Sequence, residues 1–323
     1  MRNWFPVRQR FATSTHRCAS LVALLVAALA ACSPSPWRPS ESQSAPRIWD
    51  VHGARFVSES RLVADVAHAR YRLLGEIHDD PAHHAIRARL IGEIASRGVR
   101  PAVVFEQFDL DHDKALEAAQ RAGADAEQLA DAGALDRKGW GWPLHKPIVV
   151  AALAAGLPIR AGNLSRAALG RDVQGAARAS WGARLQAAPW TEADARALSR
   201  EIAESHCGML PDAVVPRLVL AQRMRDAAMA QALVDDATSD GAILIAGDGH
   251  VRADRGVPIY LHASGLPGAD ARSVSVGLIE VGPGEEAAAD SAARIAAEHP
   301  GFDYLWFTPV VPRADPCAGF HAS

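Results

Sequence analysis

Acidic and histidine side chains gather directly after a short apolar run in the first third of the chain. In LLGEIHDDPAHHAIR, residues 73–87, Glu76 and His78 follow two leucines almost at once. Carboxylates and imidazoles are the groups that bind transition metals and exchange protons near neutral pH. Leaving such groups buried without partners costs several kcal/mol. We therefore expect them to meet each other, an ion or a ligand.

Polar residues follow three further apolar runs in the same way. Glu106 follows AVVF, Asn163 follows PIRAG, and Asp248 and His250 follow AILIAG. In open α/β sheets, ligands bind beyond the carboxyl ends of the strands. These side chains, together with His78, should therefore converge at one edge of a sheet. We predict that His78, Glu106 and His250 form a rim that binds a metal ion or a ligand.

Helix capping is the alternative explanation for some of these polar groups. Carboxylates stabilise the N-termini of helices, and we favour that role for Asp79, Asp80 and Asp248. His83 and His84 fall in the first turn of a predicted helix, where we expect solvated surface histidines, although His84 could turn inward.

The chemistry of the rim fits a divalent transition metal such as Zn, Mn or Co, with one coordination position open to water. The same three side chains could instead orient a polar ligand without any metal. The sequence leaves both possibilities open.

The elements that must position this rim alternate between strand and helix. Continuously apolar runs predict buried strands at residues 71–75, 102–105, 157–162, 242–246 and 273–281. Helical patterns follow at 80–98, irregularly over 109–139, at 146–156 and at 213–237. We predict an α/β fold: a mostly parallel central sheet covered by helices on both faces (α/β/α), with a helical insertion.

The N-terminus has the features of a lipoprotein signal. Arginines precede the apolar run LVALLVAALA, which is too short to span a bilayer comfortably, and LAAC ends it. We predict a signal peptide over 1–31, lipidation of Cys32, a Ser/Pro-rich tether over 32–47, a folded domain over 48–312 and a C-terminal tail over 313–323. The alternative is a plain signal peptide with an incidental cysteine. By resemblance to lipoprotein sorting signals, Ser33 after the cysteine favours the outer membrane, with a lipid anchor holding the domain on its periplasmic or surface side.

Charge and cysteine content narrow the classes of protein further. The chain has 323 residues and a net charge of −3, without a basic stripe, so we expect no nucleic-acid partner. Once Cys18 has left with the signal peptide and Cys32 is lipidated, Cys207 and Cys317 remain. In an oxidising compartment they either pair in a disulfide or stay as two unrelated thiols.

The chain resembles the ChaN-type haem-binding lipoproteins of the Tiki superfamily. The resemblance runs from about residue 48 to 309 through LLGEIHDDPAHH, VVFEQFD, WGWPLHKPIV, AGNLSR, HCGMLP, AQRMRDAAMA, IAGDGHVRADRGVPIYL and DYLWFTP. The superfamily's two G-x-x-H motifs and a glutamate fall here on Gly75/His78, Gly247/His250 and Glu106. The resemblance implies an α/β/α fold, haem binding in iron uptake, and a homodimer that holds cofacial haems by tyrosine ligation.

One departure from the family bears on the ligand of the haem. WPLH places His145 where such proteins often have a tyrosine. Histidine also ligates haem iron, but with a different redox preference. We therefore take His145, Trp142, Tyr260 and Tyr304 as the candidate haem-binding residues. The chain has no C-x-x-C-H motif, so covalent haem attachment is excluded.

Two functions of different classes follow from these observations. The first is an outer-membrane-anchored protein that binds haem. The second is a metal-dependent hydrolase, a protease or an esterase, in which the rim activates water and Glu76 acts as general base. A structural lipoprotein is the third, plainer alternative. No serine lies in a G-x-S-x-G motif, so covalent acyl chemistry is not supported.

Overall fold

The computed structural model describes residues 47–173, 178–263, 265, 268, 270–285, 288–315 and 317–318. The predicted signal peptide, Cys32 and nearly all of the predicted tether lie outside the described residues. Within the described ones, the first strand begins at Ile48. None of the described helices is both long enough and apolar enough to cross a membrane.

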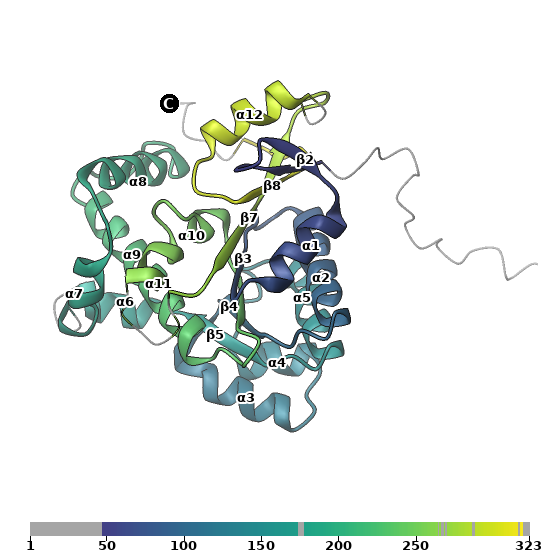
Figure 1. The fold of residues 1–323 in the computed structure, drawn as a ribbon. Helices are drawn as coiled ribbons and strands as arrows, with labels where there is room; N and C mark the ends of the chain where they lie inside the picture. The colour runs from purple at the N-terminus through teal and green to yellow at the C-terminus, as the bar shows by residue number, and fades with distance from the viewer. Residues whose placement is uncertain are drawn as a thin grey trace, which may run out of the picture. The chain divides into compact units, whose positions relative to one another are not determined.

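An eight-stranded sheet forms the centre of this part of the chain (Figure 1). Its order is β2-β1-β8-β7-β3-β6-β4-β5. The strands are β1 (Ile48–Asp50), β2 (Arg55–Val57), β3 (Tyr71–Leu74), β4 (Ala102–Asp109), β5 (Ile159–Asn163), β6 (Ala242–Ile245), β7 (Ser273–Val281) and β8 (Tyr304–Pro309).

The pairing is parallel from β8 through β7, β3, β6 and β4 to β5, and β1 is antiparallel to both β8 and β2. Strands β3 and β6 are buried along their whole length, as parallel strands covered on both faces should be. The predicted fold class, a mostly parallel sheet in an α/β/α arrangement, is confirmed.

Helices cover the two faces of the sheet and build two cores. One core joins it to α1 (Glu59–His68), α2 (Pro81–Ser96) and α5 (Trp142–Ala154). The other joins it to α9 (Val215–Asp235), α11 (Val257–Ala263) and α12 (Ala289–Glu298). The remaining helices are η1 (Leu110–His112), α3 (Asp113–Arg121), α4 (Ala126–Ala132), α6 (Arg166–Val173), α7 (Arg178–Ala187), α8 (Glu192–Ser205) and α10 (Asp248–Val251).

Local sequence explains where the two helices nearest the site begin. Asp80 caps α2, because its Oδ1 accepts a hydrogen bond from the Ala82 amide at 2.7 Å, and Pro81 occupies the first helical position. Helix α5 begins at Trp142, earlier than the predicted residue 146. Gly141 precedes it with a φ of 57°, a conformation that glycine adopts without strain.

Candidate functional site

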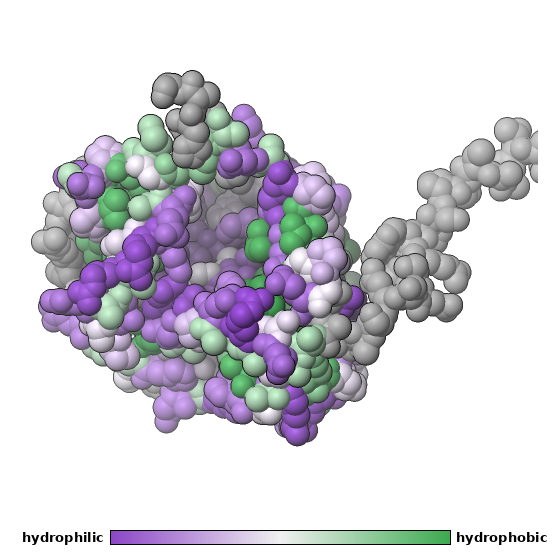
Figure 2. Space-filling model, turned by 90° about the horizontal axis from the view of Figure 1, so that it is seen from above, coloured by the Kyte–Doolittle hydropathy of each residue, from purple (hydrophilic) through white to green (hydrophobic). Residues whose placement is uncertain are grey.

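Three strand ends bring the sequence-predicted polar residues to one edge of the sheet. Glu76 and His78 lie directly after β3, Glu106 lies within β4, and His250 lies in α10 just after β6. Because β6 is hydrogen-bonded to β3 on one side and β4 on the other, these residues meet although they are far apart in sequence. Figure 2 looks onto the side on which α8 and α12 lie in Figure 1; this face is hollowed, and hydrophilic residues gather around the hollow.

His250 is held between two carboxylates. Its Nε2 lies 3.2 Å from Oε1 of Glu106, and its Nδ1 lies 2.5 Å from Oδ1 of Asp226 on α9. The other oxygen of Glu106 accepts a hydrogen bond from the Gly247 amide at 2.8 Å. Gln222, one turn before Asp226, places its Nε2 3.1 Å from the His250 ring.

These contacts make His250 a cation over the physiological pH range. Burial by itself would lower the pKa of His250, but the facing Glu106 and Asp226 raise it to about 10. Burial would raise the pKa of Glu106, but His250 brings it well below its usual range. Burial raises the pKa of Asp226 to about 6 against the pull of His250.

His250 is therefore not available to a metal ion, because a carboxylate faces each of its ring nitrogens. The predicted rim of His78, Glu106 and His250 is not one ligand set. The structure divides it into a closed ion pair, Glu106–His250, and a second group around Glu76 and His78.

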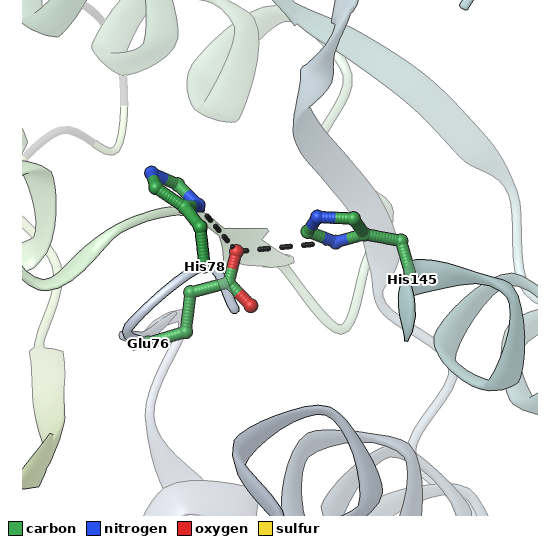
Figure 3. Close-up of side chains that lie close together, drawn as sticks. All are labelled: Glu76, His78 and His145. Atoms are coloured by element: carbon green, nitrogen blue, oxygen red, sulfur yellow. Dashed lines mark hydrogen bonds and ion pairs between the residues drawn. The ribbon is translucent and has the colours of Figure 1, made fainter. Parts of the chain in front are cut away.

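The second group centres on the carboxylate of Glu76 (Figure 3). Its Oε1 lies between two imidazoles, 2.8 Å from Nδ1 of His78 and 3.9 Å from Nδ1 of His145 on α5. Gln107 donates a hydrogen bond to the same oxygen at 3.2 Å. Glu76 and His145 are buried, whereas the side chain of His78 is 46% exposed. The group therefore reaches the surface through His78.

A buried cation holds the other oxygen of Glu76. The guanidinium of Arg87 contacts Oε2 and also donates a hydrogen bond to Nδ1 of His84 at 3.0 Å. The His84 ring, which carries its proton on Nε2, is therefore not a donor to Glu76. Burial lowers the pKa of Arg87 to about 9, which still leaves it charged at neutral pH. A carboxylate that receives so many donors is poorly suited to take a proton from water, so the arrangement does not favour Glu76 as the general base of a hydrolase.

The prediction of solvated surface histidines at the start of α2 is wrong. His83 and His84 are both buried. Nδ1 of His83 accepts a hydrogen bond from the Ile77 amide at 2.9 Å, and its Nε2 lies 2.8 Å from Oγ1 of Thr308. Nε2 of His84 donates to the His78 carbonyl at 2.9 Å. Both histidines face the sheet because the first turn of α2 packs against the loop that follows β3.

His145 differs from these histidines: among the described residues neither of its ring nitrogens has a hydrogen-bond partner, although it is only 1% exposed. Burial, followed by the charges of His84 and Arg87, lowers its pKa to about 2, so the ring is neutral. It packs edge-on against His84, with ring centroids 4.3 Å apart, and against Trp140 at 6.1 Å.

Glycine is required in both G-x-x-H motifs because the two motifs touch. A Cβ atom at Gly75 would overlap Oδ1 of Asp248, whose backbone belongs to the other motif. A Cβ atom at Gly247 would lie 2.9 Å from Nε2 of His78. Asp248 does not cap a helix as predicted; Gly247 is the N-cap of α10, and Oδ1 of Asp248 accepts a hydrogen bond from the Leu278 amide at 3.3 Å.

Both tyrosines predicted as haem ligands have hydrogen-bond partners. Tyr260 on α11 accepts a hydrogen bond from Nε of Arg223, at 2.8 Å, and Tyr304 on β8 donates one to Asp65 at 3.0 Å. Both side chains are buried. Burial raises the pKa of Tyr304 to about 12 and that of Tyr260 further, so neither readily becomes the tyrosinate that iron prefers. The structure does not bring them together with His145.

Trp142, the fourth predicted haem-binding residue, is buried in the core beside α4. Its indole Nε1 donates hydrogen bonds to Glu127 at 3.0 Å. Trp140 is the indole that reaches the site instead, since its ring lies 5.2 Å from the His78 ring.

The chain carries a disulfide just after α8, and α8 itself lines a pocket that reaches the partners of His250. Cys207, after α8, and Cys317, in the tail, form a disulfide with their Cα atoms 5.5 Å apart. Helices α8 and α9 line a pocket of about 380 Å³ that reaches Gln222 and Asp226. Its polar lining also includes Arg225.

Sequence reasoning missed four residues that shape the site. Arg87, Gln107, Gln222 and Asp226 all contact the sequence-predicted groups. The segment AQRMRDAAMA contributes to the family resemblance, but the sequence alone assigns Asp226 no role. Its contact with His250 becomes visible only in the structure, where α9 lies beside α10. Arg87 fits the pattern of a solvated helix face, and only the position of β3 shows that it is buried.

Comparison with known proteins adds an independent observation. Residues 62–261 match the family model described as haem-binding uptake, Tiki superfamily, ChaN. The chain belongs to this family. No curated protein matches it in a sequence search.

Among solved structures, one titled "Cofacial heme binding to ChaN of Campylobacter jejuni" superposes with a TM-score of 0.62 at 22% identity. It covers 80% of this chain and 94% of its own. That similarity supports the ChaN-like fold. The type III effector HopBA1 superposes with a TM-score of 0.42 at 12% identity, covering 85% of this chain and 100% of its own.

Proposed function

We propose that this ChaN-family protein binds haem with His78 as the axial ligand. The observation that carries the proposal is the state of that imidazole. Glu76 holds its Nδ1 at 2.8 Å, and Nε2 has no hydrogen-bond partner among the described residues. A histidine that donates its other N–H to a carboxylate is the usual form of a metal-ligating histidine. Haem, when bound, supplies an iron centre that accepts such a nitrogen.

The other candidate ligands fit the group less well. His145 is 1% exposed, so a porphyrin could reach it only after α5 had moved. Tyr260 and Tyr304 are buried and hydrogen-bonded. His78 is half-exposed, and the ring of Trp140 beside it adds an aromatic surface of the kind that packs against a flat macrocycle.

The wider role that we propose is haem or iron uptake at the outer membrane. The support is the lipobox-like LAAC before Ser33 and the uptake role in the family's description. Acylated Cys32 would anchor the mature chain, since several acyl chains bind a membrane stably where one does not. We further propose a homodimer that forms around the haem, so that apparent affinity rises with protein concentration.

A hemin titration of the purified full chain tests the ligand. The wild type should give a saturable Soret band with the visible bands of histidine ligation. His78→Ala should lower the affinity at least tenfold. The control is His68→Ala, which removes an exposed histidine of α1 whose ring contacts its own helix at the Ala64 carbonyl. Equal hemin binding by the wild type and His78→Ala would exclude His78 as the ligand.

A further inference from the structure

We propose that Glu76, His78 and His145 form a binding site for one divalent first-row transition metal ion, which the protein can occupy without haem. The site differs from the rim predicted from sequence, since it includes neither Glu106 nor His250. It uses instead His145, on α5.

The spacing of the three side chains suits a single ion. One ligand atom from each residue lies within 4.8 Å of the other two. The measured separations are 2.8 Å from Glu76 Oε1 to His78 Nδ1 and 3.9 Å from the same oxygen to His145 Nδ1. Ligands about 2.0–2.1 Å from a tetrahedral ion lie about 3.4 Å from one another. Shifts of about 1 Å or less in side chains that already face one another would thus close a coordination shell.

His145 supplies the independent sign that something binds here. A buried imidazole without any hydrogen bond is an unusual cost, about 1–3 kcal/mol for each polar group left unsatisfied. Its Nδ1 faces Glu76, as the dashed line in Figure 3 shows. The packing of His84 and Trp140 against the ring keeps it in that orientation. A metal ion would give this nitrogen the partner that the protein does not.

The type of ligand indicates the class of ion. Two imidazoles and one carboxylate are typical of Fe²⁺, Co²⁺ and Zn²⁺, whereas Mg²⁺ and Ca²⁺ prefer oxygen ligands. Because the side chain of His78 is 46% exposed, the remaining coordination positions are on the solvent side. Such an ion would be held by three protein ligands and completed by water.

The charges around the site leave room for a second cation. Arg87 contacts Oε2 of Glu76, whereas His78 and His145 face Oε1, so Arg87 and a metal ion would use different oxygens. Glu106 and Asp248 also lie close enough to act on the charge of Arg87. Glu106 is already paired with His250, so Asp248 is the carboxylate of the two that can offset part of the repulsion between Arg87 and a metal ion.

The metal site and the proposed haem site use opposite nitrogens of His78. The metal takes Nδ1, and haem iron takes Nε2. The inference does not depend on haem binding, and metal binding is tested on haem-free protein. A failed hemin titration would therefore not contradict the metal site. A failed metal titration would likewise not contradict haem binding.

Titration of the haem-free full chain with Co²⁺ tests the site. We expect one equivalent to bind, with visible d–d absorption that 1,10-phenanthroline removes, and a rise in melting temperature with Co²⁺ concentration. His145→Gln should weaken binding at least tenfold and change the absorption bands. His68→Ala, the same exposed control, should behave like the wild type.

The Co²⁺ titration has results that support the metal site and results that contradict it. If His145→Gln fails to fold, the half-exposed His78→Ala serves as the variant, and the same loss is expected. A wild type that binds no Co²⁺ would overturn the proposal. Equal Co²⁺ affinity and spectra in the wild type and in the folded variant would overturn it too.

Discussion

At the scale of single residues, the closed pair of Glu106 and His250 governs how stability depends on pH. The raised pKa of His250, about 10 against an ordinary value of 6.5, means that the folded state holds its proton more tightly than the unfolded state does. That stabilisation is complete below pH 6.5 and is lost as the pH rises through 10. Glu106 acts oppositely, because its lowered pKa makes its contribution present above pH 4.5 and lost in acid.

The variant His250→Gln should therefore be less stable than the wild type mainly below pH 10, where His250 carries its proton in the folded wild type. We expect it to unfold about 3–5 kcal/mol more easily than the wild type near pH 6, because two buried carboxylates lose their cation. The difference should shrink towards pH 10. Urea unfolding at pH 6, 8 and 10 measures it. A difference that stays constant over this range would mean that His250 is not charged in the folded protein.

The glycine of the second G-x-x-H motif offers a sharper residue-scale test. In Gly247→Ala the new Cβ would lie 2.9 Å from Nε2 of His78, so this ring must move. Haem affinity should fall at least tenfold, whereas stability should change little because the half-exposed His78 ring can move aside. Gly249→Ala is the matched control, since a Cβ there meets nothing within 4 Å. Identical hemin titrations for the two variants would contradict this account.

The sequence alone predicts which strand ends carry the site residues, but not which residues contact them. The rule that polar groups follow parallel strands brings Glu76, Glu106 and His250 to one edge, where the structure has them. The residues that contact Glu76 and His250 cannot be predicted from this rule. Asp226 reaches His250 from a helix more than twenty residues earlier, and nothing in the local pattern distinguishes a buried Arg87 from a solvated one.

At the scale of elements, the five adjacent strands β7, β3, β6, β4 and β5 were predicted, whereas β1, β2 and β8 at one side of the sheet were not. The run at 273–281 predicts β7 with its exact bounds, because most of its residues are apolar or β-branched and buried. The start of α5 was predicted four residues late. WGWP resembles a loop, yet Pro143 occupies the first turn, where proline is tolerated. Periodicity is weakest in such first turns.

The disulfide between the end of α8 and the tail should stabilise the whole fold. It closes a segment with a sequence separation of 110 residues, so breaking it frees a long loop in the unfolded chain. Cys207→Ser should lower the free energy of unfolding by about 2–4 kcal/mol in urea, and so should Cys317→Ser. The double variant should match either single one. A double variant much less stable than the singles would show that the cysteines act separately.

At the scale of the whole molecule, the proposed lipid anchor on Cys32 would hold the protein at the outer membrane. Cells fed radioactive palmitate should label the wild type in the outer-membrane fraction, and Cys32→Ser should lose the label. The variant should still bind hemin, because Cys32 lies well before the first strand at Ile48. Lipid on Cys32→Ser would refute the lipobox.

The position of β3 in the sheet sets the order in which the molecule can assemble during synthesis. Its two hydrogen-bonded neighbours are β6 and β7, which begin at Ala242 and Ser273. The strand that carries Glu76 and His78 at its end is thus made early and paired late. An apolar strand that waits for its neighbours is prone to aggregate. A growing chain therefore has most need of a chaperone after β3 has been made and before β6 and β7 follow. A premature stop before residue 242 would leave β3 without either of the strands that pair with it.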